Sequence, residues 1–224
     1  MAIICSEINL LYFCVAKAGS TSISNMLIKF FHGKFIPENH IWNLENEQIL
    51  VDRKHSTLQE LLKYNILTVD YLKNFHILIN ARNPFDWVLS DYLFKLQCHD
   101  IYLKGDAPDW ITSRADMLSK TASMKFNEHI FYTYRNKKCS VFQKYIDGLE
   151  NIAGIDFDIV KIEQINDDFQ KVAKKLGIKK YPSIGHENST QAKKDNYRMY
   201  YSNESRSIIE KSFANDLTLL EYEF

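Results

Sequence analysis

The sequence predicts an α/β fold in three layers, with a central parallel sheet between two layers of helices. Three segments carry this prediction, because in each an apolar run is followed by a short turn and then by a helical pattern of apolar residues; the runs lie around Leu10, Ile77 and Ile159. A strand, a helix and a parallel strand in succession form a right-handed crossover, and such crossovers cover both faces of the sheet. Ligand loops are expected at the carboxyl ends of these strands.

The first segment ends in a loop suited to an anion. Residues 10–15 are apolar, residues 16–19 form a small-residue loop with Lys17 and Gly19, and the hydroxyl residues 20–22 begin a helix. Free N–H groups and the helix dipole attract a phosphate at such a place, while the lysine adds charge and the hydroxyls add hydrogen bonds. The lysine precedes the glycine, so the loop is not the GxxxxGK[ST] loop of nucleotide triphosphatases.

The second segment offers a separate phosphate contact. Residues 77–79 predict a buried strand, and Asn83 followed by Pro84 predicts the start of a helix. Arg82 then lies at the carboxyl end of the strand, and Ser90 lies about two turns into the helix. An arginine fork and a hydroxyl group suit a second phosphate. Alternatively, Arg82 only pairs with a carboxylate near the helix end.

Both motifs resemble those of one enzyme family. The stretch KAGSTS at residues 17–22 resembles the 5'-phosphosulfate loop of sulfotransferases, PKxGxTS, with Ala16 in place of the family proline. The stretch RNPFDWVLSDY at residues 82–92 resembles the family's 3'-phosphate signature, RNPxxRxxSxY, with Trp87 in place of the second arginine. The chain is therefore identified as a member of the sulfotransferases that use 3'-phosphoadenosine 5'-phosphosulfate (PAPS).

Later segments extend the resemblance over nearly the whole chain. Residues 158–177 are similar to a later strand and acidic turn of the family, with Glu163 in the acidic position, where a structural role is favoured over a catalytic one. Residues 186–224 are similar to the ending of carbohydrate-type members, in which an asparagine/serine loop precedes a tyrosine pair and a final helix. The correspondence is weakest at residues 98–127. Residues 98–143 are expected to be mainly helical and to determine the acceptor.

The resemblance implies a fold similar to that of P-loop nucleotide-binding proteins and a single sulfotransferase domain over residues 1–224. It implies PAPS as the sulfuryl donor and a hydroxyl group as the acceptor, with a saccharide favoured. The donor-binding residues that it implies are Lys17, Ala18, Gly19, Ser20, Thr21, Ser22, Arg82 and Ser90.

Sulfuryl transfer requires charge stabilisation on the leaving phosphate and a base for the acceptor proton. Lys17 is the expected partner of the leaving 5'-phosphate. His55 is the predicted base, because imidazole titrates near neutrality and because residues 53–57 resemble a KHxT-like segment of carbohydrate-type members. Its alternative role is that of an exposed or capping histidine. His32, His40 and His99 are rival bases.

Two other functions are compatible with these motifs. A small-molecule kinase with a variant phosphate loop would need a Ser/Thr after a Gly-Lys pair and an acidic partner at a strand end, and neither is evident. A non-catalytic nucleotide-binding or interaction module could keep the fold while losing the activity, and the changes at Ala16 and Trp87 are compatible with that loss.

Composition limits the partners, the metal content and the cellular compartment that are expected for the protein. Lys plus Arg and Asp plus Glu number 28 each, so no basic surface predicts nucleic-acid binding. No apolar run approaches the roughly 18 residues of a membrane span, and the first residues lack a signal-peptide pattern. Neither the four cysteines nor the seven histidines have metal-ligand spacing, so no metal is expected. Free buried or half-buried thiols indicate a reducing cytoplasm. The oligomeric state is left open.

Overall fold

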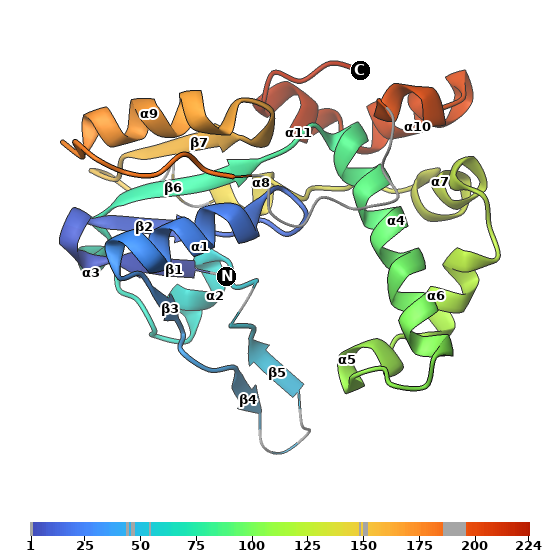
Figure 1. Ribbon diagram of the computed structural model, residues 1–224, viewed down its shortest axis with the longest axis horizontal. Helices are drawn as coiled ribbons and strands as arrows, with labels where there is room; N and C mark the ends of the chain where they lie inside the picture. Colours follow the sequence, from blue (N-terminus) through green and yellow to red (C-terminus); the bar gives the residue numbers. More distant parts are fainter. Residues whose placement is uncertain are drawn as a thin grey trace. The chain divides into compact units, whose positions relative to one another are not determined.

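The computed structural model describes residues 2–43, 45, 48–53, 55–147, 149, 152–185 and 196–224. The chain divides into two compact units. The first comprises residues 1–82 and 141–188, and the second comprises residues 83–140 and 189–224. Figure 1 shows their helices and strands. The asparagine/serine loop expected at residues 186–190 lies outside the described residues, as does Lys54.

The first unit contains the central sheet. The described strands are ordered β3 (Lys34–Ile36), β1 (Ala2–Cys5), β2 (Leu10–Phe13), β6 (His76–Ala81) and β7 (Phe157–Lys161). The three strands predicted from the sequence, β2, β6 and β7, are parallel neighbours, which confirms the predicted α/β fold. Strands β1 and β3, which the sequence patterns did not predict, extend the sheet on one side: β1 is antiparallel to β2, and β3 is antiparallel to β1.

Helices α1 (Ser20–Phe31) and α9 (Ile165–Lys175) cover one face of this sheet. The core beneath them includes Tyr12 of β2, Leu78 of β6 and Val160 of β7, all fully buried. Figure 1 shows α9 alongside β7. The side chains that point to the opposite face, among them Phe13 and Ile79, are equally buried. Both faces are therefore covered, as alternating strands and helices require.

The remaining elements of the first unit are short. They are η1 (Ser6–Ile8), α2 (Leu58–Lys63), α3 (Val69–Leu72), α8 (Gln143–Ile146), η2 (Ile162–Gln164) and a two-stranded antiparallel ribbon of β4 (Ile41–Asn43) and β5 (Gln48–Val51). Trp42 and Ile49 are cross-strand partners on this ribbon, and both side chains are exposed.

The second unit is helical. It contains α4 (Pro84–Leu103), α5 (Asp109–Thr112), α6 (Ala115–Ala122), α7 (Phe126–Tyr134), η3 (Tyr197–Tyr200), α10 (Asn203–Ser212) and α11 (Ala214–Leu219). The predicted start of α4 is confirmed, because the Asn83 side chain accepts a hydrogen bond from the N–H of Phe85 at 3.0 Å and Pro84 is the first helical residue. The ring of Phe85 meets those of Tyr201 and Phe224. No helix in the described part of the chain is both long and apolar enough to cross a bilayer.

All four cysteines are free thiols, as predicted. Cys5, Cys14 and Cys98 are buried, and Cys139 is partly buried. Burial raises the pKa of Cys5 to about 12 and that of Cys14 to about 11. The Cys14 sulfur lies 3.4 Å from the hydroxyl of Ser24, and this contact joins the end of β2 to α1.

A buried histidine should make the stability of the second unit depend on pH. Burial, and to a lesser extent the charge of Lys95, lowers the pKa of His129 from 6.5 to about 4, although Asp91 acts in the opposite direction. In the unfolded chain His129 is therefore protonated below about pH 6.5, whereas in the folded chain it is protonated only below about pH 4. Stability should be fully present above pH 6.5 and should fall by roughly 1.4 kcal/mol per pH unit between the two values.

We expect His129→Phe, which keeps a ring beside Tyr92, to remove this acid-side loss. Denaturant unfolding between pH 4 and 7.5 measures the effect in both proteins. Parallel stability profiles of the variant and the wild type would contradict it.

Candidate active site

Three loops meet at the carboxyl edge of the sheet. In the parallel ladders Phe13 is opposite Ile79, and Ala81 is opposite Lys161, so β2, β6 and β7 all end at the same edge. Lys17 follows β2, and Arg82 follows β6 directly. The structure thus brings the two predicted phosphate-binding segments together, although 65 residues separate them.

The loop after β2 has the backbone of an anion-binding loop. Lys17 and Gly19 have positive φ angles of 63° and 76°, and Gly19 is the N-cap of α1. Alternation of right- and left-handed residues turns successive N–H groups toward one concavity. The first turn of α1 contains no acidic residue, so nothing there opposes an anion. A lysine in the left-handed region is unusual, and such strain is characteristic of functional loops.

Asn80 and Arg82 hold this loop from β6. The Asn80 oxygen accepts from the N–H of Val15 at 2.8 Å, while its nitrogen donates to the carbonyls of Val15 and Ala18 at 3.1 and 2.6 Å. Arg82 donates from Nη1 to the carbonyl of Lys17 at 2.7 Å. Arg82, the predicted contact for the second phosphate, therefore also fixes the backbone of the loop that is predicted to bind the first phosphate.

The turn after β7 makes a third contact with the loop that follows β2. A Cβ atom on Gly19 would lie 2.6 Å from Cδ1 of Ile162, so a larger residue at this position would require the Ile162 side chain to move. The turn that carries Ile162 is itself fixed by Asp168, whose carboxylate accepts from the N–H of Lys161 and from the side chains of Gln164 and Lys171. Burial would raise the pKa of Asp168, but these hydrogen bonds outweigh it and lower the pKa below 3.8.

The predicted loop residues differ in accessibility. The side chains of Lys17, Ser20 and Thr21 are partly exposed, whereas Ala18 and Ser22 are buried. A charged group and two hydroxyls are therefore accessible at the N-terminus of α1. These groups can bind a phosphate or sulfate through charge and hydrogen bonds.

The other residues of the second motif are largely structural. In the second unit Ser90 is only 2% exposed, which is the least favourable observation for its predicted phosphate contact. The Tyr92 hydroxyl donates to the carbonyl of Met124 at 2.8 Å. Trp87, which replaces the family arginine, packs its ring against Phe213. Asn83 donates to the carbonyl of Glu223 at 2.8 Å.

His55 lies in the first unit, on an exposed turn between β5 and α2. The turn is anchored at its next residue, Ser56, which is fully buried and donates through its N–H to the carbonyl of Asp52 at 3.1 Å. His40 lies nearby, because its Nδ1 accepts from the N–H of Arg53 at 3.1 Å. The role of His55 as base stays a prediction.

Two other groups that could accept a proton, the His32 imidazole and the Glu60 carboxylate, make structural contacts. His32 caps the C-terminus of α1 and pairs with Glu7, so the 12 residues of the helix, about 18 Å, separate it from the loop. Glu60 serves a capping box at the start of α2, where its Oε2 accepts from the N–H and the hydroxyl of Thr57. His99, the remaining rival, lies on α4 in the second unit.

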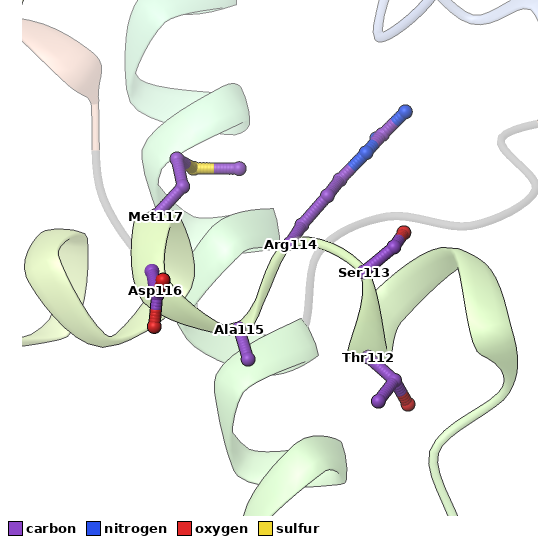
Figure 2. A pocket seen from close by; sticks show the side chains of 6 residues that line it. All are labelled: Thr112, Ser113, Arg114, Ala115, Asp116 and Met117. Atoms are coloured by element: carbon purple, nitrogen blue, oxygen red, sulfur yellow. The ribbon is translucent and has the colours of Figure 1, made fainter.

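A surface hollow in the second unit lies at the turn between α5 and α6. Residues 112–117 line it, and the Arg114 side chain extends away from the turn (Figure 2). Trp110, 49% exposed, stacks on Phe94 near this hollow at 6.3 Å between ring centroids. This is part of the segment for which the sequence predicts a role in acceptor choice, and that role stays a prediction.

Asn80 is the residue of this site that the sequence analysis missed. Its signal is a lone amide in the strand sequence HILINA, where the other residues after His76 are apolar. A buried amide needs hydrogen-bond partners, so it indicates a fixed neighbour. Among the described residues, no group of His, Cys, Asp or Glu side chains is placed to hold a metal ion.

The observed fold is that of an α/β protein in which the loop after a parallel strand leads into the N-terminus of a helix. A model of the sulfotransferase family matches residues 1–223. The chain therefore belongs to the sulfotransferase family, whose activity is the transfer of a sulfuryl group. Comparisons with curated proteins and with solved structures give no match.

The contact between Gly19 and Ile162 gives a test of the loop. Gly19→Ala should lower the free energy of unfolding by about 1–3 kcal/mol more than Gly177→Ala, because overpacking adds to the strain of a positive φ. Gly177 is the matched control, since its φ is +68° and no atom lies within 4 Å of an added Cβ.

Ile162→Ala in the Gly19→Ala background should recover part of the difference, because it removes Cδ1 and Cγ1. Thermal and denaturant unfolding of the four proteins measure these effects. Equal losses for the two glycine variants would rule out the close approach.

Proposed function

We propose that the protein transfers the sulfuryl group of PAPS to an acceptor hydroxyl, with a saccharide as the favoured acceptor. One observation carries the proposal: the loop with Lys17 between β2 and α1, held by Asn80 and Arg82, in a chain of the sulfotransferase family. We also propose that the whole chain acts as one sulfotransferase domain and that no metal takes part. The saccharide acceptor rests on the resemblance of the C-terminal residues to carbohydrate-type members.

In the proposed donor complex the 5'-phosphosulfate lies on residues 17–22, where the N–H groups, Ser20 and Thr21 contact its oxygens. Arg82 contacts the 3'-phosphate, and Ser90 is the second proposed contact. The neutral net charge of the chain makes such local contacts the source of donor affinity.

In the proposed sulfuryl transfer, one bond to sulfur forms and one bond to sulfur breaks. The acceptor oxygen attacks sulfur while the bond between sulfur and the bridging phosphate oxygen breaks, and the electron pair of that bond stays on the 5'-phosphate. Lys17 stabilises this developing charge, and His55 takes the acceptor proton. The products are the sulfated acceptor and adenosine 3',5'-bisphosphate.

Calorimetry with the product nucleotide tests donor recognition. Adenosine 3',5'-bisphosphate should bind roughly 10- to 150-fold more tightly than 5'-AMP, because a charged contact to the 3'-phosphate contributes about 1.5–3 kcal/mol. Arg82→Ala should reduce this preference. Equal affinity of the wild type for both nucleotides would remove the second phosphate site from the proposal.

Turnover measurements distinguish the residues that act in the transfer step from those that only bind the nucleotide. Lys17→Ala should lower turnover at saturating donor more than it lowers nucleotide affinity, since its charge is needed most in the transition state. His55→Ala should reduce turnover by about 10²- to 10⁴-fold with nucleotide affinity retained. His40→Gln tests the rival base beside this turn in the same assay, and a loss of turnover in His40→Gln alone would assign the acceptor proton to His40.

An acceptor screen with radiolabelled PAPS measures these rates. Unchanged turnover in His55→Ala would transfer the role of base to another residue. Tight nucleotide binding without transfer to any acceptor would favour the non-catalytic module.

A further inference from the structure

Asn80 is completely buried, and its side chain makes three hydrogen bonds. Its side chain is 0% exposed and lies one residue before the end of β6. The amide uses both donors, to Val15 and Ala18, and its oxygen accepts from Val15. These partners all belong to the loop region after β2, so the amide joins two segments 62 to 65 residues apart. A neighbouring apolar side chain in the same strand could not make this connection.

The bonds fix the direction of two consecutive peptide groups. Asn80 holds the carbonyl of Ala18, and Arg82 holds the carbonyl of Lys17. In a trans peptide the N–H points opposite to the carbonyl. The N–H groups of Ala18 and Gly19 therefore point away from Asn80 and Arg82, and neither donates to another described residue.

We infer that Asn80 is a positioning residue for the donor loop: it fixes the carbonyls of Val15 and Ala18, so that the N–H groups of the loop are aimed at the 5'-phosphosulfate before the donor binds. The inference rests on the proposed function for the identity of the anion. Prior orientation matters because donors that are already aligned need no reorganisation when the ligand arrives. Arg82 has the same effect on Lys17, in addition to its proposed contact with the 3'-phosphate.

The test compares nucleotides that carry one phosphate each. Asn80→Leu keeps the approximate shape of the side chain and removes all three hydrogen bonds. Its affinity for 5'-AMP should fall roughly 10- to 100-fold, since small misplacements of binding groups have effects of this size. Its affinity for 3'-AMP should change less than about twofold on the same reasoning. Leu78→Val, on the same face of β6, controls for a general loss of strand packing.

Hydrogen exchange of the nucleotide-free proteins supplies a second readout. Amides of residues 16–22 should exchange faster in Asn80→Leu than in Leu78→Val, while amides of the second unit are unchanged. Asn80→Thr, which suits a strand and keeps one hydroxyl, replaces the leucine variant if that protein does not fold, and it should give an intermediate effect.

The results of these experiments distinguish the proposed function from the positioning role of Asn80. A wild type that binds neither 5'-AMP nor adenosine 3',5'-bisphosphate would overturn the proposed function, and the exchange data would still decide the role of Asn80. Equal losses of 5'-AMP and 3'-AMP affinity, or unchanged exchange of residues 16–22, would overturn the positioning role. Selective loss of 5'-AMP affinity with faster loop exchange supports it.

Discussion

Parallel pairing of β2 with β6 is the constraint on which the candidate active site depends. The ladder brings Phe13 opposite Ile79, and the two chains leave the sheet side by side. Beyond the last paired residues, the side chain of Asn80 offers Val15 one acceptor and one donor, as the backbone of a neighbouring strand would. The amide side chain thus continues the hydrogen-bonding pattern of the ladder by one residue. The backbone of residues 16–19 can then turn away while Val15, where the loop begins, stays fixed.

A loop that is held in this way can bind an anion in a chain without net charge. Long-range attraction contributes little when 28 basic residues are balanced by 28 acidic ones. Selectivity must then come from short-range contacts: oriented N–H groups, one lysine and the hydroxyls at the start of α1. The left-handed conformation of Lys17 is stabilised by the contact of its carbonyl with Arg82, so the strain of the loop is offset by the residue that follows β6.

The sequence predicted what local patterns encode. The three strand–loop–helix segments, the Asn83–Pro84 helix start and the helical nature of residues 98–143 are all found, because each depends on neighbours within a few residues. Strands β1 and β3, which pair antiparallel to each other, were missed, since short strands without a clear alternating pattern are recognised only through their partners. The contacts of Asn80 with the loop and of Ile162 with Gly19 depend on chain segments far apart in sequence. The burial of Ser90 has the same origin, because the spacing of apolar residues does not predict that tertiary packing also buries a polar position of the helix.

The free thiols of the sheet give the protein internal reporters of local opening. Cys5 on β1 and Cys14 after β2 are buried, and burial keeps both sulfurs protonated at neutral pH because their pKa values lie at about 12 and 11. Only the thiolate reacts with alkylating reagents, so each cysteine becomes reactive when its strand separates from α1. Cys14 lies two residues before Ala16, so its rate of alkylation would follow the opening of the chain segment that supports residues 16–19.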